Sequence, residues 1–272
     1  MPTSSISSPV VLSIAGFDPS GGAGLIADVR AFVAFGCWPV AAITSLTFQN
    51  SERFAGAIHQ SAESLRAQIL PVVKEFRIAA VKIGMLPTRE LVLEVARLLG
   101  ETKMPAPIID PVLHSSSGYE LMEPEAKETW LAELMPLARL ITPNIPEAEA
   151  LTGIGIANES DMRAAARKLR ETGARAVLIK GGHLEHRSEI RGQRSEQLRT
   201  NERQAIDLLD DQGAVTVFRD EWIDAPPVRG TGCMLSAAIA AGLAHGMNLQ
   251  ESVGAAKQFV AGVIRYAPQL GS

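Results

Sequence analysis

Short apolar runs without polar alternation recur along the chain, and each of them ends in or close to a glycine, aspartate, proline or asparagine. Successive apolar positions are typical of strands that are buried on both faces of a parallel sheet. Six runs show this pattern: VVLSIAG (10–16), PVAAIT (39–44), IAAVKIG (78–84), APIID (106–110), ARLITPN (138–144) and AVLIKGG (176–182). We therefore expect a central, mainly parallel sheet.

Segments with helical spacing of apolar residues lie between and after these runs. The expected helices are 24–35, 62–75, 88–99, 124–134, 159–172, 231–245 and 249–266. Gly36, Gly100 and Gly173 follow three of them, at positions where helices often end on a left-handed residue. Strands that alternate with helices predict an α/β domain with helices on both faces of the sheet.

The segment 184–204 interrupts this alternation, because it is densely charged and almost free of large apolar residues. Such composition is typical of a solvated loop. A mobile flap is the alternative, since the segment lies between AVLIKGG and the strand-like AIDLLDD (205–211). Neither a repeat nor a linker divides the chain, so we expect residues 1–272 to form one domain, with 1–9 flexible.

Composition limits the classes of protein to which the chain can belong. The chain has 272 residues, 46% of them hydrophobic, and a net charge of -4, which offers no basic excess to bind nucleic acid. Two cysteines are too few for a disulfide framework and fit a reducing compartment. No basic leader and no apolar stretch of about 20 residues is present. We expect a cytoplasmic protein without a membrane or nucleic-acid partner.

Two glycine-rich turns are candidate ligand sites. GFDPSGGAG (16–24) follows an expected strand and opens a helix, so its backbone can approach a ligand closely, although a plain strand-to-helix turn explains it equally well. RGTGC (229–233) opens a second helix, where backbone N–H groups and the helix dipole favour an anion such as phosphate. Neither a Walker A loop nor a Rossmann fingerprint is present at RGTGC.

Polar side chains follow other expected strands. Asn144 and Glu147 offer an amide and a carboxylate to a hydrated Mg²⁺, which takes few protein ligands; the alternative is that they only cap a short helix. Lys180 closes a strand and suits a phosphate or nucleotide contact, or is simply a solvated strand end. Asp110 ends another strand, where its carboxylate is suited to hold a water on the metal.

Cys233 lies in the first turn of an expected helix, where the dipole favours its thiolate, so it is a candidate base or nucleophile. The alternative is an inert small hydrophobic residue. The chain has neither a G-x-S-x-G elbow nor an H-E-x-x-H pair, which argues against a hydrolase and against a zinc site.

Taken in order, the motifs resemble those of the hydroxymethylpyrimidine/phosphomethylpyrimidine kinases of the ribokinase-like superfamily, from about residue 10 to 261. The resemblance rests on AGFDPSGGAG with the downstream Asp28, FQN (48–50), KIGML (82–86), DPV (110–112), TPNIPEAE, KGGH and GTGCMLSAA. It implies a three-layer α/β sandwich that uses ATP and Mg²⁺. The implied substrate is an aminopyrimidine alcohol of thiamin biosynthesis. Its hydroxymethyl group receives a γ-phosphoryl group from ATP, and the resulting monophosphate then receives a second one.

The resemblance also implies roles for individual residues. The pyrimidine pocket comprises Gly16, Asp18, Ala23, Gln49, Met85 and Val112, with Gln49 reading the ring by hydrogen bonds. The nucleotide is held by Asn144, Lys180 and Arg229, and the metal by Asp110 and Glu147. The anion hole consists of Gly230, Thr231 and Gly232, and Cys233 is the base or the group that positions the acceptor hydroxyl.

Three departures from the family pattern leave alternatives open. The family usually has Asn-Thr-His before Gly-Thr-Gly-Cys, where this chain has Pro227, Val228 and Arg229. A lysine after DPV is replaced by Ser116, which puts the second phosphorylation in doubt, and the charged segment 184–204 is longer than usual. The alternatives are a pyridoxal/pyridoxine kinase, a non-catalytic pyrimidine-binding homologue and a transferase with Cys233 as nucleophile. A homodimer is compatible with the sequence.

Overall fold

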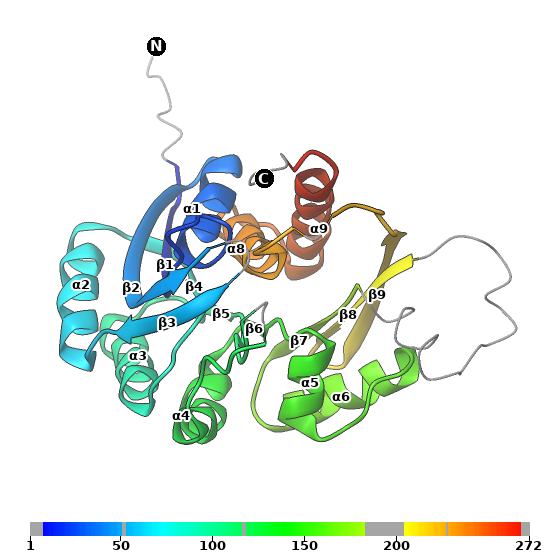
Figure 1. The fold of residues 1–272 in the computed structure, drawn as a ribbon, viewed down its shortest axis with the longest axis horizontal. Helices are drawn as coiled ribbons and strands as arrows, with labels where there is room; N and C mark the ends of the chain where they lie inside the picture. The colour runs from blue at the N-terminus through cyan, green and yellow to red at the C-terminus, as the bar shows by residue number, and fades with distance from the viewer. Residues whose placement is uncertain (1–7, 51–52, 116–117, 183–203, 227, 268–272) are drawn as a thin grey trace, which may run out of the picture.

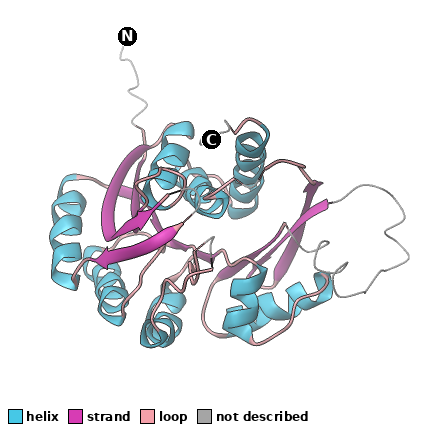
Figure 2. Ribbon diagram, in the orientation of Figure 1, coloured by secondary structure: helices cyan, strands magenta, loops and turns pink. Residues whose placement is uncertain are grey.

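The computed structural model describes residues 8–50, 53–115, 118–182, 204–226 and 228–267. A sheet crosses the centre of this part of the chain, in the order β3-β2-β1-β4-β5-β6-β7-β8-β9 (Figures 1 and 2). The strands are β1 (Val10–Phe17), β2 (Trp38–Gln49), β3 (Phe54–His59), β4 (Ile78–Ile83), β5 (Ile108–Ile109), β6 (Leu140–Ile141), β7 (Ala176–Gly181), β8 (Gln204–Asp211) and β9 (Ala214–Glu221).

The six apolar runs all contain strands, as the sequence predicts. The pairs from β2 through β1, β4, β5 and β6 to β7 are parallel, and the residues of β1 between its ends are buried. β3 joins β2 antiparallel at one edge, and β8 and β9 extend the other edge antiparallel. The sequence analysis did not identify β3 and β9, which are partly exposed edge strands: β3 has only the short run FAGAI, and β9 interrupts its apolar residues with Thr216 and ends in charged residues.

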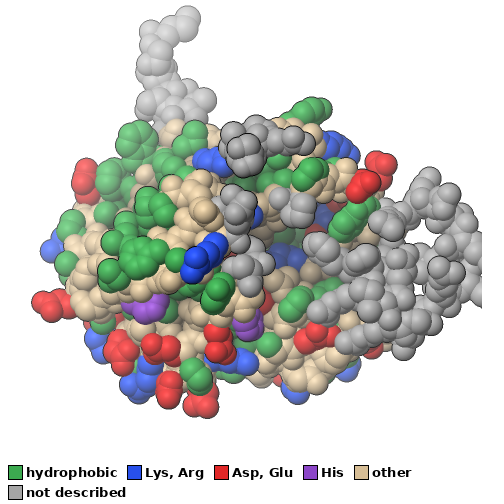
Figure 3. Space-filling model, viewed as in Figure 1, with side chains coloured by type: hydrophobic (Ala, Val, Ile, Leu, Met, Phe, Trp, Pro, Cys, Tyr) green, Lys and Arg blue, Asp and Glu red, His purple; other side chains and the backbone are tan. Residues whose placement is uncertain are grey.

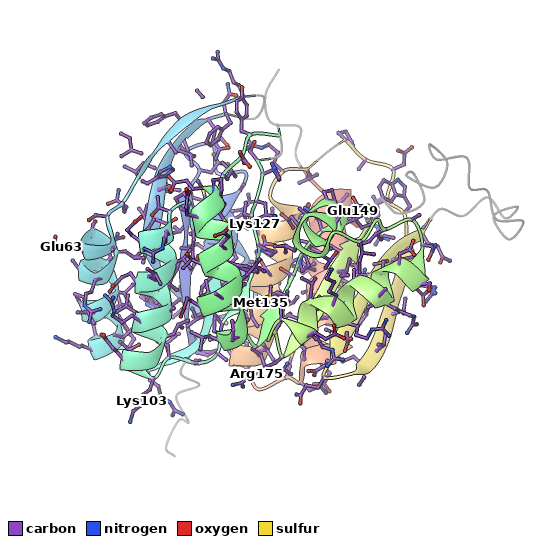
Figure 4. The ribbon with its side chains drawn as sticks, turned by 90° about the horizontal axis from the view of Figure 1, so that it is seen from below. Glu63, Lys103, Lys127, Met135, Glu149 and Arg175 are labelled. Atoms are coloured by element: carbon purple, nitrogen blue, oxygen red, sulfur yellow. The ribbon has the colours of Figure 1, made fainter. Side chains whose placement is uncertain are left out.

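Helices cover both faces of the sheet. On one face lie α1 (Gly24–Ala34), α8 (Thr231–Ala244) and α9 (Leu249–Arg265); on the other lie α2 (Ala62–Glu75), α3 (Arg89–Thr102), α4 (Pro124–Thr129), α5 (Ile145–Thr152) and α6 (Glu159–Glu171) (Figure 1). The view from below shows the second layer side by side, with Glu63 on α2, Lys127 on α4 and Glu149 on α5 (Figure 4). Each layer has its own buried apolar cluster against the sheet. The architecture is the predicted three-layer α/β sandwich.

The ends of two predicted helices differ from expectation. Gly36 and Gly173 have left-handed backbone, with φ of 72° and 116°, as predicted. Gly100 instead lies inside α3, and Lys103 takes the left-handed conformation after the helix, with φ of 53°. No atom lies within 4 Å of a Cβ placed on Gly100, so neither a turn nor a close approach requires glycine there. The predicted helix 124–134 narrows to α4 followed by a π-helical turn, Trp130–Leu134.

Some predictions lie outside the described residues. The charged segment is described only from Gln204, where β8 begins, so the loop and flap interpretations of 184–203 both stay predictions. The same holds for the flexibility of residues 1–7 and for Ser116 and Pro227. In the described part of the chain, no helix is both long and apolar enough to span a membrane.

Candidate active site

A cavity of about 460 Å³ opens where the parallel strands end. The space-filling view shows a hollow near the middle of this face, with basic side-chain atoms visible inside it (Figure 3). Every residue predicted for the site lines this cavity: Gly16, Asp18, Ala23, Gln49, Met85, Asp110, Val112, Asn144, Glu147, Lys180, Arg229, Gly230, Thr231, Gly232 and Cys233. Convergence of residues from so many segments follows from the sheet, because parallel strands present their carboxyl ends at one edge.

The first glycine-rich turn is held by Asp18, whose side chain is 1% exposed. Its carboxylate accepts hydrogen bonds from the Ser20 backbone N–H (2.9 Å), the Ser20 hydroxyl (2.7 Å) and the Ala23 backbone N–H (2.9 Å). Gly24 has φ of 56°, and a Cβ there would lie 2.3 Å from the Gly16 carbonyl oxygen. Asp18 thus shapes the turn that lines the pocket, and both of its oxygens are engaged within that turn.

The second glycine-rich turn packs directly on the first. Gly230 precedes α8 with φ of 72°, and a Cβ there would lie 2.1 Å from the carbonyl oxygen of Gly22. The following residues begin α8, whose body is buried in the core. The N–H groups of a first helical turn have no partners within the helix. The turn therefore directs donors and the positive end of the helix dipole at the cavity, as an anion site requires.

Charged side chains meet at the ends of β5, β6 and β7. Lys180 Nζ donates to Asp110 Oδ1 at 2.7 Å, and the Thr142 hydroxyl donates to the same oxygen at 3.1 Å. Burial alone would raise the pKa of Asp110, but Lys180 and Lys82 outweigh it and hold the pKa below its ordinary value. Burial also opposes the charge of Lys180, yet Asp110 and Glu147 raise its pKa overall. Lys180 is thus a fixed cation in the cavity.

Asn144 and Glu147 form a capping box at the start of α5. The Glu147 backbone N–H donates to Asn144 Oδ1 at 2.9 Å, and the Asn144 N–H donates to Glu147 Oε2 at 2.8 Å. The capping interpretation is therefore confirmed. Both residues nonetheless face the cavity, so they are also available to a ligand. Burial raises the pKa of Glu147 to about 7, against the opposing effect of Lys180.

The carboxylates Asp110 and Glu147 are a suitable, sparse donor set for Mg²⁺. In the part of the chain that the structure describes, no group of three or more His, Cys, Asp or Glu side chains is placed to hold a metal. Mg²⁺ is usually bound through one or two carboxylates together with substrate phosphates and waters. Two buried carboxylates that line the same cavity as the turn before α8 fit that requirement.

Cys233 differs from expectation in its ionisation. It lies in the first turn of α8 and is partly exposed to the cavity. Burial among protein atoms raises its pKa to about 12, although Lys82 opposes the shift, and Asp110 and Asp28 add to it. The expectation that the helix dipole leaves the thiol partly ionised near neutral pH is therefore wrong for the free protein. Desolvation and two nearby carboxylates outweigh the dipole.

Lys82 is a cavity residue to which the sequence assigned no role. It lies in β4, is completely buried and donates to Asp28 Oδ2 of α1 at 2.8 Å. The Ser13 hydroxyl of β1 donates to the same carboxylate oxygen at 2.6 Å. The lysine inside the apolar run IAAVKIG could have indicated a buried ion pair, because a buried lysine requires a partner.

Comparison with known proteins identifies the family of this chain. A family model described as phosphomethylpyrimidine kinase matches residues 18–272. The hydroxymethylpyrimidine/phosphomethylpyrimidine kinase of Streptomyces coelicolor is 38% identical over 270 residues, which are 99% of this chain and 94% of the relative. Its counterpart in Rhizobium meliloti is 40% identical over 262 residues, 96% of this chain and 92% of the relative. The chain belongs to the phosphomethylpyrimidine kinase family.

Solved structures similar to this kinase confirm the ribokinase-like fold. The crystal structure of a phosphomethylpyrimidine kinase from Clostridium difficile has a TM-score of 0.79 and 36% identity, and covers 94% of this chain and 100% of that chain. An ADP complex of Bacillus subtilis pyridoxal kinase has a TM-score of 0.83 and 32% identity, with 97% and 95% covered. The fold is thus shared by kinases named for a pyrimidine and for a pyridine substrate.

In this kinase the side chain of Arg229 lies beside residues expected to bind the pyrimidine. Its Nη2 donates to Gln49 Oε1 at 2.7 Å, and its Nη1 donates to the Asn50 carbonyl. Nη2 also lies 4.0 Å from Asp18 Oδ2. Within the described residues, the guanidinium makes no hydrogen bond or ion pair with Asn144 or Lys180, the other residues expected to bind the nucleotide. The contact with Gln49 could not be predicted from local sequence, because the two residues lie 180 positions apart in the chain.

Proposed function

We propose that this kinase transfers the γ-phosphoryl group of ATP to 4-amino-5-hydroxymethyl-2-methylpyrimidine, to its monophosphate, or to both, in thiamin biosynthesis. The observation that carries the proposal is the convergence of an anion-binding turn, a fixed cation and a hydrogen-bonding amide on one cavity. The relatives from Streptomyces coelicolor and Rhizobium meliloti are named for this substrate and for its phosphate. ATP is the proposed donor because a Staphylococcus aureus pyridoxal kinase of the same fold was solved in complex with AMP-PCP and pyridoxal.

The two ends of the cavity suit the two substrates. Gly16, Met85 and Val112 line the acceptor end, where the Gln49 amide reads the polar edge of the pyrimidine ring. At the other end Lys180 and Asn144 bind the phosphates of the nucleotide. Gly230, Thr231 and Gly232 direct their N–H groups at the γ-phosphoryl group, where charge is neutralised during transfer.

Asp110 and Glu147 would hold Mg²⁺ with the nucleotide phosphates, and the metal would neutralise phosphate charge there. In the transfer itself, the acceptor oxygen forms a bond to the γ-phosphorus as the bond from that phosphorus to the ADP oxygen breaks. The proton of the acceptor hydroxyl passes to a phosphate oxygen or to water. Since such transition states are loose, positioning and charge neutralisation supply most of the acceleration.

The raised pKa of Cys233, about 12, favours one of its two expected roles. A thiol that stays protonated at neutral pH does not serve as a resting base. We therefore assign Cys233 to positioning the acceptor hydroxyl against the γ-phosphoryl group. The same protonation argues against the Cys233 nucleophile, because the thiolate is the reactive form.

A product assay tests the proposal. The wild type, Cys233→Ala and Lys180→Met are incubated with the pyrimidine alcohol and MgATP, and the products are identified by mass spectrometry. We expect monophosphate, with or without diphosphate, from the wild type and much less from both variants. Cys37→Ala is the matched control, because Cys37 is buried away from the cavity and contacts Ala241 and His245.

The same assay separates the alternatives. Product from pyridoxine but none from the pyrimidine alcohol would replace the proposal with a pyridoxine kinase. Binding of the pyrimidine alcohol in calorimetry without formation of ADP would identify a non-catalytic homologue. A covalent adduct on Cys233 after incubation with substrate would support the alternative of a transferase that uses Cys233 as its nucleophile.

A further inference from the structure

Three polar side chains are joined in a chain of hydrogen bonds at the acceptor end of the cavity. The Thr47 hydroxyl donates to the Phe17 carbonyl at 2.8 Å, and Gln49 Nε2 donates to Thr47 Oγ1 at 2.8 Å. Arg229 Nη2 donates to Gln49 Oε1 at 2.7 Å. Thr47 and Gln49 lie on β2, whereas Arg229 lies in the turn before α8. The amide of Gln49 is therefore held from two sides by separate segments.

The count of protons fixes which way this amide points. A threonine hydroxyl has one proton, and the Phe17 carbonyl can only accept it, so the Thr47 oxygen is left as an acceptor toward Gln49. An arginine guanidinium can only donate. Thr47 therefore requires the nitrogen of the Gln49 amide on its side, and Arg229 requires the oxygen on the other. Reversing the amide would break both hydrogen bonds.

Arg229 is itself held in place. Its Nη1 donates to the Asn50 carbonyl, its Nη2 lies 4.0 Å from the buried Asp18 carboxylate, and its side chain is 20% exposed. Its charge thus lies between the first glycine-rich turn and the end of β2. The guanidinium is fixed before any substrate enters, which makes it suited to orient a neighbour.

The oriented amide leaves one N–H and one oxygen lone pair without a protein partner among the described residues. Gln49 lines the cavity, so these two groups are available to a ring. A ring that carries an acceptor nitrogen next to an exocyclic amino group satisfies both at once. A pyridine alcohol without that amino group leaves the Gln49 oxygen without its donor, and an unmade hydrogen bond in a site built for it disfavours the analogue.

We infer that Arg229, together with Thr47, orients Gln49 so that the cavity selects an aminopyrimidine alcohol over a pyridine alcohol. Arg229 is thereby a positioning residue that determines specificity, and its guanidinium serves the acceptor rather than the nucleotide. The inference rests on the proposed function, because it takes Gln49 as the residue that reads the ring.

Steady-state kinetics of wild type, Arg229→Met and Arg229→Lys test the inference, with the pyrimidine alcohol, pyridoxine and ATP each varied. Arg229→Met keeps a long unbranched stem but loses every donor. We expect its KM for the pyrimidine alcohol to rise about tenfold and its preference over pyridoxine, as a ratio of kcat/KM, to fall about tenfold. The KM for ATP should change less than twofold. Arg229→Lys should recover part of the preference, because one donor remains.

Arg53→Met is the matched control, since Arg53 is an exposed arginine on the neighbouring turn that does not line the cavity. Melting temperatures of all variants establish that the fold is intact. An equal loss of kcat on both alcohols would identify a merely structural role and overturn the inference. A raised KM for ATP with an unchanged preference would overturn it as well, because Arg229 would then serve the nucleotide.

Different results would contradict the proposed function and the role of Arg229. A wild type that phosphorylates neither alcohol defeats the proposed function. A wild type that phosphorylates the pyrimidine alcohol, with an Arg229→Met variant that keeps its KM and its preference, defeats only the inference about Arg229.

Discussion

Lys82 Nζ donates to Asp28 Oδ2 at 2.8 Å, and both side chains are completely buried between β4 and α1. Burial raises the pKa of Asp28, although Lys82 and Ser13 oppose the shift. Asp28 Oδ1 has no hydrogen-bond partner in the described part of the structure. The pair is therefore a buried charged contact at the wall of the cavity, in which Lys82 is the hydrogen-bonded cation of Asp28.

Removal of one partner should destabilise the protein strongly. We expect Asp28→Ala to lower the free energy of unfolding by about 3–5 kcal/mol in urea titrations, because Lys82 would be left as an uncompensated buried charge. Replacing both partners, in Asp28→Leu with Lys82→Met, should lower it less than Asp28→Ala alone. The exposed pair of Arg163 and Glu159 is the control, and Arg163→Ala should lower it by less than about 1 kcal/mol. Similar decreases in the free energy of unfolding for Asp28→Ala and Arg163→Ala would contradict the expectation.

The ionisation of Cys233 predicts the pH dependence of its alkylation. With a pKa of about 12, roughly one molecule in ten thousand carries the thiolate at pH 8. Since the thiolate is the reactive form, the rate of reaction with iodoacetamide should rise about tenfold for each pH unit between pH 7 and 10, without a plateau. Mass spectrometry of the Cys233 peptide measures it, and Cys233→Ser gives the background from Cys37. A plateau near pH 8 would show that the thiol is far more acidic than the structure indicates.

The sequence predicted the elements and residues that depend on local pattern. The runs around Val11 and Val81 identified parallel strands because both faces of those strands are buried. Cavity residues such as Asp110 and Lys180 could be found because strand ends carry polar residues and because the ordered motifs resemble a known family. The edge strand β9 was missed, since its apolar residues are interrupted by Thr216 and followed by charged residues, and much of the strand is exposed.

Properties that depend on tertiary contacts could not be predicted from the pattern. The pKa of Cys233 is set by burial and by charges from Lys82 and Asp110, which belong to distant segments. The contact between Arg229 and Gln49 joins residues 180 positions apart, and nothing near either residue indicates it. The position of Cys233 at a helix N-terminus suggested a lowered pKa, because the helix dipole can be inferred from local sequence. The desolvation that raises the pKa depends on the tertiary structure and cannot.

The contact between the two glycine-rich turns predicts a sharp requirement at Gly230. An alanine Cβ would lie 2.1 Å from the Gly22 carbonyl oxygen, in addition to the strain of a left-handed residue. We expect Gly230→Ala to displace the turn, to abolish measurable kinase activity and to lower the melting temperature. Gly36→Ala is a matched control, because Gly36 has the same φ of 72° but no atom within 4 Å of its Cβ position. Equal effects of the two substitutions would show that backbone strain alone matters.

Substitution of Gly232, unlike that of Gly230, should impair nucleotide binding without lowering the stability of the protein. Gly232 lies inside α8 without a left-handed backbone, and a Cβ there would lie 3.1 Å from Lys180 Nζ and 3.9 Å from Asp110 Oδ2. Alanine is favoured over glycine in a helix interior by about 1 kcal/mol, and by less in a first turn such as that of Gly232, so Gly232→Ala should keep the melting temperature or raise it slightly. Its methyl group should nevertheless crowd the phosphate end of the cavity and raise the KM for ATP at least tenfold. Gly262→Ala in α9 is the control, since no atom meets its Cβ and its KM for ATP should be unchanged. A Gly232→Ala variant with the KM of the wild type would place the nucleotide phosphates away from Lys180.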